Sequence, residues 1–194
     1  MKKVVVFASG SGTDFQSILD AIAEKSLHAE IAGLITNNPD AGALERAQKN
    51  DIPERVFRLS DYPDTESYTN DLVDQLDEWK PDLIVLAGYL KKIPVEVIRQ
   101  YENRIINIHP ALLPKYGGKG FYGIKVHRAV IASGDRESGC TVHIVTEEYD
   151  KGPILAQVKV SVQKDDTPEI LQQRVLKEEH RLLPQVINNL LTQK

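Results

Sequence analysis

Short apolar runs and longer amphipathic patterns alternate along most of the chain. Several apolar runs are continuous, which is typical of strands that are buried on both faces of a sheet. The segments between them repeat apolar residues at helical spacing. This alternation predicts an α/β fold, in which a mostly parallel, twisted, Rossmann-like sheet carries helices on both faces. The expected strands are 3–9, 31–36, 55–59, 83–88, 104–109, 140–146 and 154–162, and the expected helices between them are 13–26, 41–50, 64–79, 94–101 and 122–133.

The C-terminal part of the chain departs from this alternation. The segment 147–153 between the last two strands is too short for a crossover helix, so these strands are predicted to form an antiparallel hairpin. A long apolar stripe over 167–191 predicts a C-terminal helix, with Thr167 as its N-cap and Pro168 at its first position. We expect all of these elements to form one domain over residues 1–194.

Composition and charge narrow the class of protein. The chain has 194 residues and a net charge of −4, so a broad basic surface for nucleic acid is not expected. Cys140 is the single cysteine, which excludes an intrachain disulfide and fits a reducing, cytoplasmic compartment. The N-terminal apolar run, 4–8, is too short for a signal-peptide core or a membrane span, and we therefore expect no membrane association.

A glycine- and serine-rich loop follows the first expected strand. Residues 8–14 read ASGSGTD and lead into a helix. Glycines let the backbone approach a ligand, and free N–H groups at a helix start favour an anion, so the loop predicts a phosphate site. Neither the third glycine of the dinucleotide fingerprint nor the Gly-Lys-Ser/Thr of a nucleotide P-loop is present. The alternative is a tight turn in which Thr13 or Asp14 caps the helix.

Two polar residues close the apolar strand 104–109. Asn107 and His109 are two positions apart, so their side chains point to the same face and can share a pocket. An asparagine can donate to a developing oxyanion, and a histidine can move a proton near neutral pH. A loop containing Pro110 and Pro114 follows them. The alternative is an ordinary polar strand end whose hydrogen bonds are satisfied.

An Asp-Lys-Gly-Pro sequence begins at Asp150, after the strand 140–146. Alone it indicates a turn, because Asp and Gly are common turn residues. If strands 104–109 and 140–146 end at the same edge of the sheet, however, Asp150 can reach His109. A carboxylate at that position would raise the pKa of the histidine and hold it as an acid.

These three segments, in this order and spacing, resemble the phosphoribosylglycinamide formyltransferase family. The resemblance runs from Val4 to the C-terminal helix and is most specific over 86–90 and 107–114, with 118–123 and His127 similar to bacterial members. It implies transfer of a formyl group from 10-formyltetrahydrofolate, as co-substrate, to the amine of glycinamide ribonucleotide in purine synthesis. It also implies small-molecule partners, a monomer or homodimer, a phosphate-binding half near 1–100, and a catalytic and folate-binding half near 101–194.

The resemblance assigns roles to individual residues. It makes Asn107 and His109 the catalytic pair, with Asp150 as the acid that raises the histidine pKa. Two positions depart from the usual pattern: relatives usually carry Asn where this chain has Asp14, and several carry a folate-contacting basic residue where it has Thr65. The phosphate and ribose residues implied are Ser11, Gly12, Thr13, Asp14 and Glu179, and the folate residues implied are Thr65, Leu90, Lys91, Lys92, Ile93 and Asn107.

Several alternatives stay open at this point. Formyltetrahydrofolate deformylase, a hydrolase with a similar Asn/His/Asp site, is the nearest, although it usually carries an extra N-terminal domain. A methionyl-tRNA formyltransferase would add a basic C-terminal domain, and a binding module would lack the catalytic set. No metal is expected, because the remaining histidines lack ligand spacing and are interpreted as structural or surface residues: His28, His127, His143 and His180.

Overall fold

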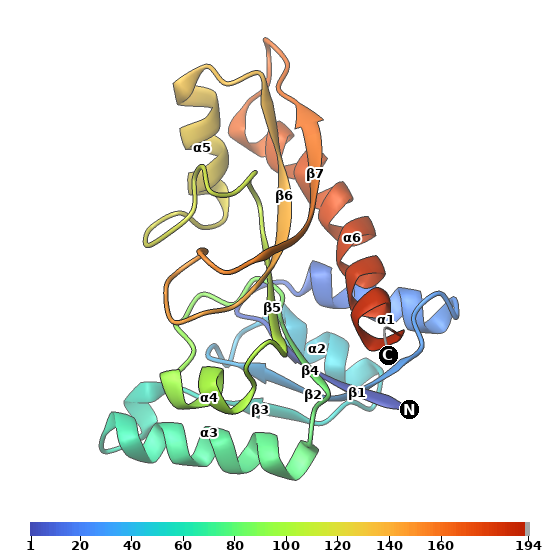
Figure 1. The fold of residues 1–194 in the computed structure, drawn as a ribbon, viewed down its shortest axis with the longest axis vertical. Helices are drawn as coiled ribbons and strands as arrows, with labels where there is room; N and C mark the ends of the chain where they lie inside the picture. The colour runs from blue at the N-terminus through green and yellow to red at the C-terminus, as the bar shows by residue number, and fades with distance from the viewer. Residues whose placement is uncertain (193–194) are drawn as a thin grey trace.

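The computed structural model describes residues 1–192, and they form one seven-stranded sheet in the order β3-β2-β1-β4-β5-β6-β7 (Figure 1). The first five strands are mutually parallel, whereas β6 and β7 run antiparallel to their neighbours. The mostly parallel sheet and the C-terminal hairpin are therefore as predicted. The strands are β1 (Lys2–Phe7), β2 (Ala29–Thr36), β3 (Glu54–Val56), β4 (Leu83–Leu86), β5 (Ile105–His109), β6 (Glu137–Ile144) and β7 (Ile154–Ser161).

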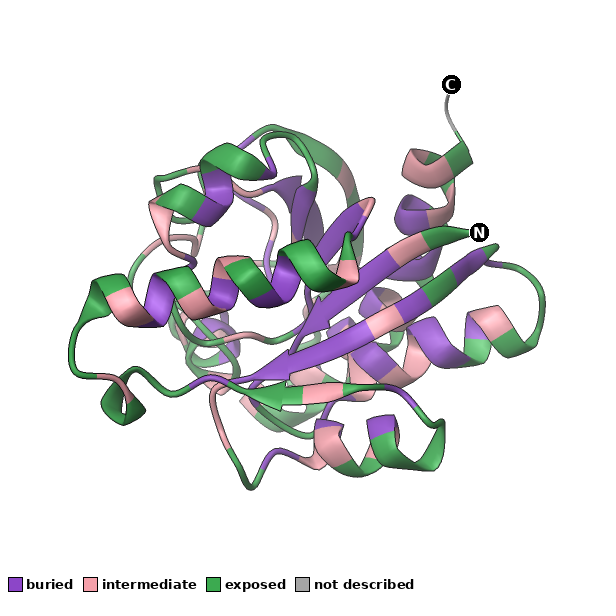
Figure 2. Ribbon diagram, turned by 90° about the horizontal axis from the view of Figure 1, so that it is seen from below, coloured by how far each residue is buried: buried purple, intermediate pink, exposed green. Residues whose placement is uncertain are grey.

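Helices cover both faces of this sheet, as the alternating pattern predicted. On one face β1 and β4 pack against α1, α2 and α6, and on the other face they pack against α3 and α4. Figure 2 shows the strands largely purple, hence buried, while the helices turn green sides to solvent. The helices are α1 (Thr13–Ala23), α2 (Gly42–Lys49), α3 (Thr65–Trp79), α4 (Val95–Gln100), α5 (Ile124–Ser133), α6 (Pro168–Thr192) and the short 3-10 helix η1 (Leu59–Asp61).

Every predicted strand and helix is present, with ends within three residues of those expected. Two strands differ by three residues at one end: β6 begins earlier, at Glu137, and β3 stops at Val56 because the chain then turns into η1. The long C-terminal helix is confirmed, and its apolar stripe packs on the sheet and on α1. None of the helices within residues 1–192 is long and apolar enough to cross a membrane.

One relation between strands was predicted wrongly. We expected 104–109 and 140–146 to end at the same edge of the sheet, but β6 is antiparallel to β5, and Thr141 lies opposite His109. The reason is the placement of α5, which stays beyond the carboxyl end of β5 instead of returning along the sheet (Figure 1). The chain therefore enters β6 from the carboxyl end of β5 and runs back toward its start.

The strand order places a switch point between β1 and β4. Because the connections from β1 and β4 lead away to opposite sides, a crevice opens at the carboxyl ends of these strands, where ligands bind in such sheets. Ser9 bridges the loops around the crevice. Its hydroxyl donates to the Asn37 side chain and accepts the backbone N–H of Leu90 at 2.9 Å. The loops after β1 and β4 are thereby held in a fixed relation.

The stability of this arrangement depends on the contact between α6 and the sheet. Leu183 of α6 is fully buried in the core, and we expect Leu183→Ala to lower the free energy of unfolding by about 2–5 kcal/mol through lost burial and a residual cavity. Ile170, on the same helix, is 46% exposed. Ile170→Ala should therefore change the free energy of unfolding by no more than about 0.5 kcal/mol. Urea denaturation of both variants measures the difference, and equal losses would contradict this packing.

Candidate active site

A cavity of about 610 Å³ occupies the crevice at the carboxyl ends of β1, β4 and β5. Its walls come from the loops after these strands, from the 145–150 segment after β6, and from α6. Nearly all of the residues predicted for the site line it. They are Ser11, Gly12, Thr13, Asp14, Leu90, Lys91, Lys92, Ile93, Asn107, His109, Asp150 and Glu179.

His109, at the end of β5, is held in one tautomer by the loop that follows. Its Nε2 donates to the backbone carbonyl of Tyr116 at 2.8 Å. In the neutral ring Nδ1 is therefore the unprotonated nitrogen, and it lies 3.7 Å from Oδ2 of Asp150. This nitrogen can accept a proton, and the carboxylate beside it would stabilise the imidazolium that results.

Asp150 reaches His109 by a route other than the one expected. Because β6 runs away from His109, the 145–150 loop must fold back over the sheet, and Asp150 sits in it with a left-handed backbone, φ 54°. The backbone N–H of Gly118 donates to Oδ2 of Asp150 at 2.8 Å and fixes the carboxylate. The proximity of Asp150 to His109 was thus predicted correctly, but for the wrong geometric reason.

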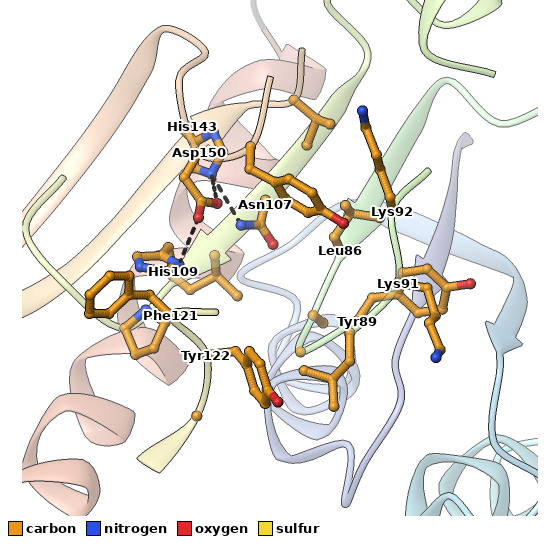
Figure 3. A pocket seen from close by; sticks show the side chains of 18 of the residues that line it. Leu86, Tyr89, Lys91, Lys92, Asn107, His109, Phe121, Tyr122, His143 and Asp150 are labelled. Atoms are coloured by element: carbon orange, nitrogen blue, oxygen red, sulfur yellow. Dashed lines mark hydrogen bonds and ion pairs between the residues drawn. The ribbon is translucent and has the colours of Figure 1, made fainter. Parts of the chain in front are cut away.

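His143 of β6 completes the cluster, and the sequence analysis missed it (Figure 3). Its Nδ1 donates to the Ile144 carbonyl at 2.8 Å, so Nε2 accepts the Asn107 side-chain amide at 3.1 Å and lies 3.5 Å from Asp150. The side chain is buried, so of the two interpretations given from the sequence, structural or surface, the surface one is excluded. The sequence contained a signal for this residue. Thr141 and His143 are two positions apart in an apolar strand, the same spacing as Asn107 and His109.

Burial sets the charge state of this cluster. It lowers the pKa of His109, and this effect outweighs the nearby charge of Asp150, which raises that pKa. The expectation that Asp150 would give His109 a raised pKa is therefore wrong in its net direction. Burial acts to raise the pKa of Asp150, but the neighbouring His143 and His109 side chains and the Gly118 N–H bring it below its ordinary value. At neutral pH the site holds an ionised Asp150 beside a neutral His109.

The glycine-serine loop forms one end of the cavity. Gly12, with φ +70°, is the N-cap of α1, and no side chain in the described part of the chain caps the helix, so the alternative of a Thr13 or Asp14 cap is excluded. A Cβ on Gly12 would lie 2.8 Å from Ala43, and only glycine fits there. The first N–H groups of α1 are therefore available to an anion.

Two carboxylate side chains, those of Asp14 and Glu179, line the cavity together with this loop. Glu179 of α6 is buried, and burial together with the charge of Asp14 raises its pKa well above the ordinary value. Burial raises the pKa of Asp14 to about 6. Glu179 was singled out because it lies on the apolar stripe of its helix, and the structure places it in the cavity wall.

The loop after β4 and the 145–150 segment line another part of the cavity. The loop after β4 supplies Leu90 to Ile93, and Lys92 lies over the Tyr149 ring at 5.7 Å. Figure 3 shows Lys91 and Lys92 across the cavity from the His109 cluster. Thr65 is not among the described residues that line the cavity. Thr65 begins α3 after the Asp64 cap, so it does not lie with the other residues that we expected to contact the folate.

Side chains suited to a resident metal do not gather in this region. Within residues 1–192 no group of three or more His, Cys, Asp or Glu side chains has the arrangement that could hold a metal ion. His127 of α5 is buried behind the site, and burial lowers its pKa to about 4. The chemistry that the site can perform with its own groups is hydrogen-bond donation from Asn107 and proton transfer at His109.

Together, the fold and the site define a class: an α/β protein with a glycine-serine loop at its switch point and an Asn–His–Asp cluster beside it. Residues 2–187 match the formyl transferase family model, and the chain belongs to that family. It is 49% identical to the chloroplastic phosphoribosylglycinamide formyltransferase of Arabidopsis thaliana over 96% of this chain. The match spans 64% of the length of that plant relative.

Solved structures agree with this assignment. The phosphoribosylglycinamide formyltransferase of Bacillus halodurans superposes with a TM-score of 0.92 at 38% identity, covering 99% of this chain and 96% of that one. A formyltetrahydrofolate deformylase of Pseudomonas syringae superposes with a TM-score of 0.85 at 28% identity, covering 96% of this chain and 60% of that one. The chain is thus more similar to the formyltransferase than to the deformylase in sequence, in fold and in length.

Proposed function

We propose that the protein transfers the formyl group of 10-formyltetrahydrofolate to the amine of glycinamide ribonucleotide, in purine synthesis. The observation that carries this proposal is the position of Asn107, His109 and Asp150 between two unlike ends of one cavity. One end offers helix N–H groups for a phosphate, and the other offers apolar and aromatic surface for a pterin. An acyl group and an amine brought in from the two ends would meet at His109.

In the proposed reaction the substrate amine attacks the formyl carbon and forms a tetrahedral oxyanion. The Asn107 amide has two N–H donors, of which one is engaged by His143. The other has no hydrogen-bond partner among residues 1–192, and it would donate to the oxyanion. Nδ1 of His109 takes the proton that the amine loses, and Asp150 stabilises the imidazolium. His109 then returns a proton to the folate nitrogen, which leaves as the C–N bond breaks.

The substrates are proposed to bind at residues that the cavity brings together. Glu179 would accept ribose hydroxyls, and Lys91, on the rim, would meet the carboxylates of the folate tail. Thr65 lies outside the cavity and has no role in this proposal. The phosphate is assigned to Ser11, Gly12, Thr13 and Asp14, and the folate ring to Leu90, Lys92, Ile93 and Asn107.

The halves named in the sequence analysis act together in this proposal. Residues near 1–100 supply the phosphate loop and the 90–93 segment, while residues near 101–194 supply the catalytic cluster and Glu179. We also propose a cytoplasmic location, which the single buried Cys140 favours, and action on small molecules as a monomer or homodimer. The plant relative described above is named as chloroplastic.

A formyl-transfer assay with and without glycinamide ribonucleotide tests the function. We expect folate release that depends on the ribonucleotide and yields one formylated product per folate released. The alternative, a deformylase, predicts formate release at the same rate whether or not the ribonucleotide is present. Ligand binding without turnover would instead indicate a binding module and would overturn the proposal.

A further inference from the structure

Asp14 is a buried carboxylate inside the loop that we assign to the substrate phosphate, and the inference below rests on that assignment. Its side chain is 13% exposed, and Oδ1 has no hydrogen-bond partner among the described residues. Negative charge on that oxygen is costly, because Oδ1 is neither solvated nor compensated by a donor. The fold nevertheless holds it at the second position of α1, next to the anion site.

The side chain that faces Asp14 is also unsatisfied. Nε2 of His180 lies 3.7 Å from Oδ1 of Asp14, and it too is buried without a hydrogen-bond partner in the described part of the chain. Burial lowers the pKa of His180, so the ring is neutral at neutral pH. One added proton would either neutralise the Asp14 carboxylate or charge the His180 ring. In both cases a donor and an acceptor would then face each other, and both unsatisfied atoms would gain a partner.

The other charged groups around Asp14 do not already supply this compensation. Glu179, the neighbour of His180 on α6, is an acid, and burial together with the charge of Asp14 raises its pKa. Arg46 of α2 is engaged elsewhere, donating to the Ser11 carbonyl and to Gln16, each at 2.8 Å. Asp20 of α1 accepts from Gln16, and its charge raises the pKa of His180 without offsetting the lowering by burial. On β6, the thiol of Cys140 has its pKa raised by burial, to about 12, and stays neutral.

A phosphate bound at the start of α1 would add negative charge beside Asp14. Like charges at close range disfavour the ionised state of a carboxylate and raise its pKa. Asp14 already has a pKa raised to about 6 by burial, so a further rise brings it into the neutral range. An asparagine there would not respond in this way, because it carries no titrating proton.

We infer that Asp14 and His180 form a proton-accepting pair that couples binding of the phosphorylated substrate to uptake of a proton from solvent. The proton is shared between Oδ1 of Asp14 and Nε2 of His180, and it is released when the ribonucleotide leaves. Asp14 is then a specificity-determining residue of the phosphate end, and it makes the affinity for a dianionic phosphate fall as the pH rises.

Titration calorimetry with glycinamide ribonucleotide tests this coupling. Binding to the wild type, Asp14→Asn and Asp74→Asn is measured at pH 7 in two buffers of different ionisation enthalpy, which gives the number of protons taken up. Asp74→Asn is the matched control, because it makes the same chemical change at an exposed position of α3 outside the cavity. Protons that the substrate amine exchanges are common to all three proteins and cancel in the comparison.

We expect the wild type and Asp74→Asn to take up more protons than Asp14→Asn, by up to about one per bound ribonucleotide. From pH 7 to pH 8 the Kd of the wild type should rise by up to about tenfold, whereas that of Asp14→Asn should change little. Equal proton uptake in all three proteins would overturn the inference and leave the proposed function intact. Failure of all three to bind the ribonucleotide would overturn the proposed function, and the inference with it.

Discussion

His109→Ala should lower kcat for formyl transfer by about 10²–10⁴-fold, the usual contribution of a positioned general acid–base group. The physical reason is that Nδ1, the ring nitrogen beside Asp150, is the group that we propose carries the proton from the amine to the folate. Affinity for glycinamide ribonucleotide should be nearly unchanged, because the phosphate loop and Glu179 lie at the other end of the cavity. Steady-state kinetics and calorimetric binding measure the two effects separately.

Two controls make this prediction specific. His28 is exposed and lies outside the cavity, so His28→Ala should leave turnover unchanged. Circular dichroism of His109→Ala should match that of the wild type, which would exclude loss of the fold as the cause. Turnover of His109→Ala within a few-fold of the wild type would remove His109 from the mechanism.

Asp150→Asn should have the second largest effect, a fall in kcat of about 100-fold or more. The asparagine keeps the size of the side chain, and its carbonyl oxygen can still accept the Gly118 N–H. What it removes is the negative charge 3.7 Å from the His109 ring, and with it the stabilisation of the imidazolium. Asp74→Asn, on the exposed side of α3, is the matched control and should retain full activity.

The same variant has a consequence for the pKa of His109. Burial keeps that pKa below the ordinary histidine value of 6.5, while Asp150 partly opposes the shift by favouring the charged ring. Removing the carboxylate should therefore lower the pKa further, and the imidazolium form should appear only at a lower pH. NMR titration of the His109 ring in both proteins measures this, and a higher pKa in Asp150→Asn would contradict the role assigned to Asp150.

The site is a case where sequence and structure contribute different information. Asn107 and His109 could be predicted because they are two apart at the end of an apolar strand, and strand geometry alone puts them on one face. His143 was missed although Thr141 and His143 have the same spacing, because a lone histidine in an apolar run more often satisfies a core hydrogen bond. Its place beside Asp150 depends on the register of β5 with β6, which the sequence pattern does not specify.

The charge state of His109 is a second feature that the sequence alone did not predict. Asp150 was expected to raise the pKa of His109, since a carboxylate near a histidine does so in water-exposed settings. The net shift is downward, because the ring is only 4% exposed and desolvation outweighs the single nearby charge. How far a group is removed from water depends on every segment packed over it, here including the 110–123 loop and the 145–150 loop.

The sequence by itself determined the kind and order of the elements, the parallel core of the sheet, the C-terminal hairpin and the place of the glycine-serine loop before α1. These follow from local periodicity and from turn and cap chemistry, which act over a few residues. Only the tertiary structure decided that β6 turns back against β5, that Asp150 reaches His109 through a folded loop, and that Asp14 and His180 face each other unsatisfied. Those features join residues that are far apart in the chain, and long-range packing and burial decide them.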